Sequence, residues 1–182
     1  MIKEAARFAA KAHEGAVRKG SHLPYIVHPM EVAMVVSAMT DDVEVIAAAY
    51  LHDVIEDANV TYEKLKETFG TRVADLVQTE SEDKTRTWKE RKQATIDRLK
   101  DATYEEKVIA FADKLSNLRS TAADYLVVGD EIWQKFHEKD KRMHAWYYKS
   151  LRERFQDFKA YPFYQEYCLL WEYVFEKERA AE

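Results

Sequence analysis

The sequence is poor in cysteine, glycine and proline: its 182 residues include one cysteine, 4 glycines and 3 prolines. A single cysteine, Cys168, cannot form an internal disulfide or a thiolate metal site, which favours a reducing compartment such as the cytosol. So few turn-forming residues argue against a sandwich or barrel of many short strands. The composition therefore favours an all-α protein.

The sequence also lacks a long apolar run and an excess of basic residues. Its most apolar stretch, Val43 to Leu51, contains Glu44 and is far shorter than the roughly 20 residues that span a bilayer. The first seven residues carry charges of both signs and do not resemble a secretory signal. The net charge of −5 offers no global attraction for nucleic acid or an anionic membrane, so we expect neither as a partner. An anionic ligand would need a local basic cluster.

Apolar residues are abundant and follow helical spacing. Hydrophobic residues make up 47% of the chain, enough for one sizeable core. A loop with Gly20, Ser21 and Pro24 is expected over residues 18–28, and a polar segment over residues 79–87. Spacing, caps and breakers predict helices over residues 2–17, 29–39, 43 onward, 62–69, 71–77, 88–99, 105–118, 139–158 and 162 onward. The helix from Val43 is apolar on most sides and should lie at the centre.

That central helix ends in an unusual polar cluster, His52-Asp53-Val54-Ile55-Glu56-Asp57. Four ionisable groups on a buried helix are costly unless they bind something. If the helix continues through them, Glu56 lies four residues from His52 and Asp57 lies four residues from Asp53, so their side chains share one face. A ligand site is the favoured interpretation. A buried salt-bridge network is the alternative.

A histidine followed by an aspartate suits a first-row divalent cation such as Mn²⁺, Fe²⁺ or Zn²⁺. Two ligands are too few for such an ion. His28, next to Pro29, and Asp113, flanked by apolar residues, would complete a set of two histidines and two aspartates with open positions for water and substrate. Taken singly, His28 is more typical of a loop and Asp113 of a cap or ion pair.

The order of these motifs resembles the HD phosphohydrolase superfamily. Within it, the chain resembles the hydrolase domain of RelA/SpoT enzymes and, more closely, the free-standing small alarmone hydrolases, which remove the 3′-pyrophosphate of (p)ppGpp. The resemblance covers roughly residues 5–119. Its stretches are Ala12-His13-Glu14-Gly15-x-x-Arg18-Lys19, Pro24-Tyr25-Ile26-x-His28-Pro29, Leu51 to Asp57, Phe69-Gly70, Asp83-Lys84, Glu90-Arg91-Lys92 and Ala112-Asp113-Lys114-Leu115-x-Asn117-Leu118-Arg119.

The resemblance implies an all-α HD-type helical bundle in a single domain, residues 1–182. The motifs would lie in residues 5–119, and helices in residues 131–182 would pack on them. It also implies a single ion, Mn²⁺ first among the candidates. The implied ligands are His28, His52, Asp53 and Asp113. Glu56 and Asp57 would stand at the attacking water, where carboxylates can take and give a proton.

The resemblance further implies how a purine nucleotide would be held. Arg18 would stack on the base, Lys19 would meet phosphate, and Asn117 and Ser120 would line the ribose. Arginine stacking on a π-face is physically reasonable. Without the resemblance, Arg18 and Lys19 would be interpreted as the solvated end of a helix.

Two further segments carry cations or aromatic rings. The basic cluster Lys84, Arg86, Lys89, Arg91 and Lys92 is either a solvated helix face or a partial contact for phosphate. Residues 142–148 fall where the family offers a basic or aromatic contact, and Arg142, Tyr147 and Tyr148 are candidates for it. The aromatic stripe Tyr161, Phe163, Tyr164, Tyr167, Trp171, Tyr173 and Phe175 is interpreted as core, because few cations accompany it.

Three functions are compatible with these residues. The leading one is hydrolysis of the 3′-pyrophosphate of (p)ppGpp. The second is another HD phosphohydrolase reaction, on NADPH, ppApp or a nucleoside monophosphate. The third is a non-catalytic nucleotide-binding or interaction protein. Glu56 and Asp57 argue against the third, because a binding module has no need of two carboxylates beside metal ligands.

Overall fold

The computed structural model describes residues 1–20 and 22–176, which fold into helices and turns, with one isolated bridge between Val17 and Pro24. The expected all-α fold is confirmed. The chain divides into two compact units, Met1–Asp83 with Ala102–Asp113 and Lys84–Asp101 with Lys114–Glu182. Ser21, expected in a loop, and residues 177–182, at the end of the expected C-terminal helices, lie outside the described residues.

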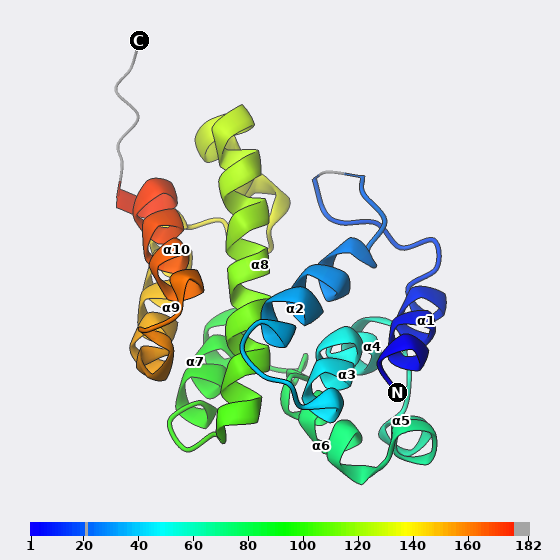
Figure 1. Ribbon diagram of the computed structural model, residues 1–182. Coiled ribbons are helices and arrows are strands. Elements are labelled where there is room, and N and C mark those ends of the chain that lie inside the picture. Colours follow the sequence, from blue (N-terminus) through cyan, green and yellow to red (C-terminus); the bar gives the residue numbers. More distant parts are fainter. Residues whose placement is uncertain (21, 177–182) are drawn as a thin grey trace. The chain divides into compact units, whose positions relative to one another are not determined.

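The first unit is built around α3, as its apolar sequence predicted. Helix α3 contacts α1, α2 and α6 (Figure 1). Five of its side chains, from Val45 to Leu51, have no exposed surface, and three of the five are alanines that let neighbouring helices approach closely. The helices of this unit are α1 (Ile2–Ala12), α2 (Val27–Ser37), α3 (Val43–Leu51), α4 (Val54–Asp57), α5 (Tyr62–Phe69), α6 (Thr71–Thr79) and the start of α8 (Tyr104–Val128).

Short polar residues and a glycine set the ends of these helices. The Asp42 carboxylate accepts a hydrogen bond from the Glu44 amide at 2.9 Å, and the Thr61 hydroxyl accepts one from the Lys64 amide at 3.2 Å. These contacts satisfy amide groups that lack a partner within the helix. Gly70 ends α5 with φ of +94°, which a residue with a Cβ rarely adopts. All three boundaries follow the sequence prediction.

Several predicted helices are shorter in the structure, among them α9, which covers Lys141–Arg154 instead of residues 139–158. Helix α1 ends at Ala12 instead of Val17, and the chain turns at Gly15, whose φ is +78°. Helix α3 ends at Leu51, so the prediction of one continuous helix through Asp57 is wrong. His52 donates from Nδ1 to the Ala49 carbonyl oxygen at 2.8 Å, the acceptor that a continuing helix offers to the next amide. A turn follows, and α4 is a separate single turn.

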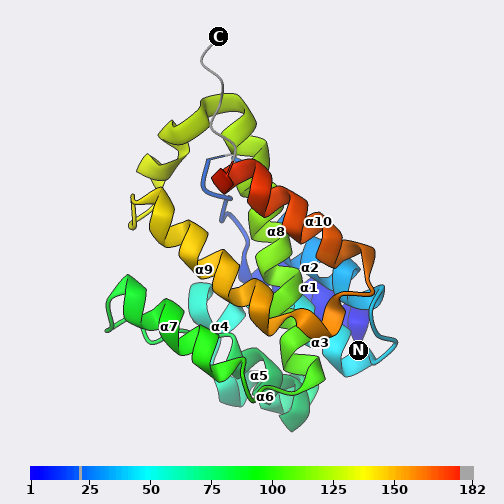
Figure 2. The same cartoon turned by 90° about the vertical axis from the view of Figure 1, so that its left-hand side faces the viewer.

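The second unit contains the aromatic residues of the C-terminal third. Figure 2 shows α9 beside α10, and α9 also contacts α7. Tyr164, Tyr167 and Trp171 of α10 are buried, as expected of core. The Tyr167 hydroxyl donates to the Tyr148 carbonyl oxygen at 2.8 Å. The elements are α7 (Trp88–Arg98), the rest of α8, the short helix Gly129–Lys135, α9 (Lys141–Arg154), the short helix Gln156–Phe158, α10 (Pro162–Trp171) and the π-helical turn Glu172–Glu176.

Helix α8 is ten residues longer than the predicted 105–118 at its C-terminal end. Residues 119–128 contain no glycine or proline, and the helix stops before Gly129, whose φ is +59°. Helix α7 begins as predicted because Thr87 and Glu90 form a reciprocal capping box. In the described part of the chain, no helix combines the length and apolar character needed to cross a membrane.

Candidate metal centre

The four predicted ligands converge in the first unit from three separate stretches of chain. His28 lies in the first turn of α2, His52 and Asp53 form the turn between α3 and α4, and Asp113 lies on α8. His28, His52 and Asp113 are only 2%, 1% and 5% exposed. Three buried groups that can carry charge are costly together, so this cluster calls for a chemical role.

The donor atoms lie close enough to share one ion. The Nε2 atoms of His28 and His52 are 3.2 Å apart. The Asp53 Oδ2 atom lies 3.0 Å from His52 Nε2 and 3.4 Å from His28 Nε2. The Asp113 Oδ1 atom lies 3.1 Å from His28 Nε2 and 3.8 Å from His52 Nε2. His28, His52 and Asp113 also meet the spacing of a metal-binding group.

The orientation of His52 fits metal binding. Its Nδ1 atom donates to the Ala49 carbonyl oxygen, so the lone pair of a neutral ring lies on Nε2, the atom that faces His28 and Asp53. Metal-binding histidines usually have their second nitrogen held in this way. The residues present therefore fit a divalent cation, and the turn that interrupts α3 also orients the ligand.

The electrostatics of the cluster also suit a cation. Burial alone would lower the pKa of His52, but the carboxylates of Asp53 and Asp113 raise this pKa well above its ordinary value. Burial alone would raise the pKa of Asp53, but the imidazoles of His52 and His28 hold it well below its ordinary value. The carboxylates thus favour positive charge at the imidazoles, and a cation held there would displace protons.

Glu56 and Asp57 lie on α4, directly after the ligand turn. The Glu56 carboxylate accepts a hydrogen bond from the Glu82 amide at 3.3 Å. Asp57 is exposed, and its amide bonds to the Asp53 carbonyl oxygen at 2.8 Å, which keeps one helical turn between the two aspartates. Although the helix is broken, Asp57 therefore stays one turn from a predicted ligand.

Tyr25 is a site residue to which the sequence analysis assigned no role. Its hydroxyl lies 2.7 Å from Asp53 Oδ2 and 3.2 Å from Asp57 Oδ2. Burial and the Asp53 carboxylate raise the pKa of this hydroxyl far above its ordinary value, so it remains a donor. The only signal in the sequence is the place of Tyr25 within Pro24-Tyr25-Ile26-x-His28-Pro29.

His13 packs beside Tyr25, with ring centroids 4.7 Å apart. It is 5% exposed, and burial lowers its pKa. Its Nε2 atom has no hydrogen-bond partner among the described residues. A neutral His13 ring therefore packs against one side of the Tyr25 ring.

The predicted nucleotide contacts are divided between the two units. Arg18 and Lys19 lie in the first unit, and the Arg18 guanidinium is 5.9 Å from the centre of the Tyr25 ring. Asn117 and Ser120 lie on the part of α8 that belongs to the second unit. Their roles toward a nucleotide stay predictions.

The second basic segment lies in the second unit, and part of it serves packing. The Lys92 ammonium lies 5.2 Å from the centre of the Tyr147 ring and 5.9 Å from that of Trp88. Tyr147 itself is buried at 3% exposure. Arg142 pairs with Asp140 at the start of α9 at 2.8 Å. Lys92 and Tyr147 therefore take part in packing within the second unit.

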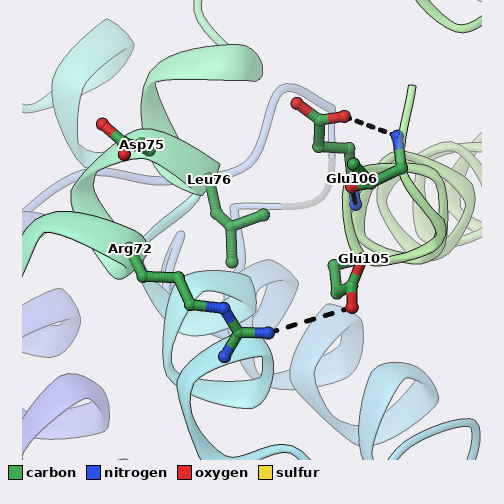
Figure 3. A pocket seen from close by; sticks show the side chains of 6 residues that line it. Arg72, Asp75, Leu76, Glu105 and Glu106 are labelled. Carbon is green, nitrogen blue, oxygen red and sulfur yellow. Dashed lines mark hydrogen bonds and ion pairs between the residues drawn. The ribbon is translucent and has the colours of Figure 1, made fainter. Parts of the chain in front are cut away.

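A pocket of about 260 Å³ opens elsewhere on the first unit (Figure 3). None of the predicted site residues lines it. Its Arg72 already pairs with Asp42 and Glu44, each at 2.7 Å, and lies 3.9 Å from Glu105. The lining residues are Arg72, Asp75, Leu76, Thr103, Glu105 and Glu106.

The chain belongs to the HD domain family, whose family model matches residues 5–137. More narrowly, it is similar to proteins named guanosine-3′,5′-bis(diphosphate) 3′-pyrophosphohydrolase MESH1. The zebrafish protein is 38% identical over 122 residues, which cover 65% of this chain and 68% of that protein. The human protein is 39% identical over 121 residues, with the same coverage.

A longer bacterial enzyme matches a smaller part of this chain. The bifunctional (p)ppGpp synthase/hydrolase SpoT of Escherichia coli is 44% identical over 77 residues, which cover 42% of this chain and 11% of that enzyme. Among solved structures, a metazoan ortholog of SpoT that hydrolyzes ppGpp aligns with a TM-score of 0.80 and 26% identity, covering 94% of this chain and 93% of that one. The Listeria monocytogenes protein lmo0812 aligns with a TM-score of 0.74 and 34% identity, covering 82% and 99%.

Proposed function

We propose that this protein is a metal-dependent hydrolase that removes the 3′-pyrophosphate of (p)ppGpp, leaving GDP or GTP and pyrophosphate. The observation that carries the proposal is the convergence of two imidazole nitrogens and two carboxylate oxygens, with His52 Nε2 3.0 Å from Asp53 Oδ2 and 3.2 Å from His28 Nε2. The similarity to proteins named as ppGpp hydrolases supports the choice of substrate. The lone cysteine supports a cytosolic enzyme.

The ligands would be His28, His52, Asp53 and Asp113, and Mn²⁺ is the ion we propose. Imidazole and carboxylate together suit a borderline first-row cation. When bound, such an ion lowers the pKa of a water molecule and offsets negative charge at the phosphorus under attack.

The chain's own residues supply proton transfer and substrate binding. Glu56 and Asp57 follow the ligand turn directly, and we assign them to accept the proton of the attacking water and return one to the departing ribose 3′-oxygen. In the first unit, Arg18 would stack on the purine and Lys19 would bind phosphate. We assign Asn117 and Ser120 to the ribose.

The direct test measures which bond breaks. Mn²⁺-loaded protein is incubated with ppGpp in H₂¹⁸O, and the products are resolved by mass spectrometry. We expect GDP and intact pyrophosphate, with the label in pyrophosphate, because water attacks the phosphorus and the bond to the ribose 3′-oxygen breaks. Label in GDP, or release of orthophosphate alone, would contradict this mechanism.

A substrate panel tests the nucleotide itself. pppGpp, ppApp, NADPH and nucleoside monophosphates are compared with ppGpp at equal concentrations, using kcat/KM. We expect the guanosine alarmones to be the best substrates. Activity confined to NADPH or to a monophosphate would assign the protein to another HD phosphohydrolase reaction, and no turnover with a specifically bound ion would favour a non-catalytic role.

A further inference from the structure

The Tyr25 hydroxyl stands between two carboxylates that belong to different halves of the site. Asp53 is a predicted metal ligand, and Asp57 is a predicted proton-transfer group. The hydroxyl oxygen is 2.7 Å from Asp53 Oδ2 and 3.2 Å from Asp57 Oδ2. The same Asp53 oxygen is 3.0 Å from His52 Nε2, so Tyr25 reaches the ligand cluster directly.

The position of Tyr25 is held from several sides. Its amide donates to the Ala16 carbonyl oxygen at 2.9 Å, beside the bridge between Val17 and Pro24. The ring packs on His13, with centroids 4.7 Å apart. It meets the His28 ring edge-on, with centroids 5.8 Å apart and an angle of 75° between the planes. A hydroxyl on such a fixed ring cannot follow its acceptors, so it sets their position.

We propose that Tyr25 is a positioning residue, whose hydroxyl holds the Asp57 carboxylate next to Asp53 and so keeps Asp57 at the attacking water. This inference rests on the proposed hydrolysis and assigns a residue that the reaction scheme above leaves without a role. Two carboxylates one helical turn apart repel each other, and the single O–H proton of Tyr25, shared between them, offsets part of that repulsion.

The kinetic test uses Tyr25→Phe, which removes the hydroxyl and keeps the ring and its packing. At saturating Mn²⁺, we expect kcat to fall by about 10- to 100-fold and KM to change by less than about twofold, because Tyr25 acts through Asp57 and not on substrate. The ion content should stay near one per chain. If kcat at saturating Mn²⁺ is within twofold of that of the unaltered protein, Tyr25 does not position Asp57.

Tyr62→Phe is the matched control. The Tyr62 hydroxyl also donates to an aspartate of the first unit, Asp75 Oδ1, at 2.7 Å, but neither residue belongs to the site. The control therefore loses the same kind of hydrogen bond without touching the ligand turn. We expect its kcat, KM and Mn²⁺ affinity to match those of the unaltered protein. An equal fall in kcat in both variants would make the effect of Tyr25 a general loss of stability and overturn the proposal.

A second measurement is independent of turnover. Thermal unfolding midpoints of metal-free protein are compared for Tyr25→Phe, Asp57→Ala and the double variant. If the hydroxyl holds Asp57, the double variant shifts by less than the sum of the single variants, because they remove the same contact. Additive shifts would show that Tyr25 and Asp57 do not interact, and would overturn the proposal. If the unaltered protein does not hydrolyse ppGpp, the proposed function fails, while non-additive shifts would still assign Tyr25 to position Asp57.

Discussion

Two buried histidines, one in each unit, have opposite surroundings. His52 of the first unit is 1% exposed and faces His28 Nε2 and the carboxylates of Asp53 and Asp113. His144 of the second unit is 8% exposed and packs among aromatic rings, with ring centroids 5.0 Å from Trp133. The pKa of His52 is raised by its carboxylate neighbours, whereas burial lowers that of His144.

The difference shows that burial alone does not distinguish a candidate metal ligand from a histidine of the core. The His144 ring nitrogen Nε2 lies 2.9 Å from the Glu138 carbonyl oxygen, so it has a backbone partner in an apolar setting. The Nε2 atom of His52 instead faces another imidazole nitrogen at 3.2 Å. Two ring nitrogens at this distance can both bind one cation. A single ring nitrogen beside a carbonyl oxygen instead forms an ordinary hydrogen bond of the core.

The largest expected effect is that of His52→Ala. It removes a predicted ligand, so we expect no Mn²⁺ uptake and a loss of more than about 10³-fold in kcat/KM. The stabilisation by metal should also vanish. For the unaltered protein at 100 times Kd, metal should contribute about 2.7 kcal/mol, or roughly 5–10 °C in Tm. Elemental analysis and thermal unfolding with and without Mn²⁺ measure both effects.

His144→Phe is the matched replacement in the second unit. We expect it to retain the ion and to keep kcat within about threefold, because His144 contacts rings and a backbone carbonyl, not ligands. Loss of the ion in His144→Phe would break the distinction between the two histidines.

Asp57→Asn should give the next largest effect. Asparagine keeps the size of the side chain but cannot accept a proton at neutral pH, so we expect the ion to stay and kcat to fall by roughly 10²–10⁴. Asp140→Asn is the comparison in the second unit, where Asp140 caps α9 through the Arg142 amide at 2.9 Å. That change should leave kcat unaltered. If Asp57→Asn loses the ion as His52→Ala does, Asp57 is itself a ligand.

Arg18→Ala and Asn117→Ala compare the substrate contacts assigned to the two units. Loss of stacking is felt in the ground state and the transition state alike, so Arg18→Ala should raise KM by about tenfold with little change in kcat, equivalent to ~1–2 kcal/mol. Asn117→Ala should raise KM less, because it removes one neutral hydrogen bond. Steady-state kinetics with ppGpp at saturating Mn²⁺ separates them. Equal KM values for Arg18→Ala and the unaltered protein would mean that Arg18 does not stack on the base and is a solvated residue.

The smallest effect is on the pH dependence of metal-free stability. A raised pKa means that His52 stabilises the fold below its unfolded value of 6.5 and that this contribution is lost as pH rises through the folded value. A lowered pKa means that His144 costs stability as pH falls below 6.5. The free energy of unfolding is measured by urea titration at several pH values for the unaltered protein, His52→Gln and His144→Phe. The difference between the unaltered protein and each variant should change with pH in opposite directions for the two variants, by at most about 1.4 kcal/mol per pH unit. If both differences change with pH in the same direction, the contrast between His52 and His144 is wrong.

Helix ends carried by local signals could be predicted from the sequence. Asp42 and Thr61 cap their helices and Gly70 ends one, because caps and positive φ depend on neighbouring residues alone. The break after Leu51 could not be predicted, because it involves a side chain of His52 that bonds back to Ala49. The predicted end of α8 at Leu118 is wrong because residues 119–128 contain no glycine or proline that would end the helix.

The convergence of the four predicted ligands could be expected from the ordered motifs, but the geometry of the cluster could not. His28 and Asp113 carry no local signal of ligation, and only the ordered motifs linked them to His52. The place of Tyr25 in the site could not be predicted, because its contact with Asp57 joins residues 32 positions apart. No periodicity within one element reports such a contact, since it depends on how α4 and the turn before α2 are placed in the first unit.

The wide spacing of the predicted ligands along the chain would affect how the protein acquires an ion during synthesis. His28, His52 and Asp53 leave the ribosome early, but Asp113 follows Asp53 by about 60 residues. At ordinary elongation rates of roughly 5–20 residues per second, the nascent chain lacks a complete ligand set for several seconds. A two-histidine, one-carboxylate fragment is open to whichever cation is most abundant or binds such donors most tightly. Under the proposed ligand assignment, the metal of the mature protein would be decided by what can exchange out after α8 has folded onto the other predicted ligands.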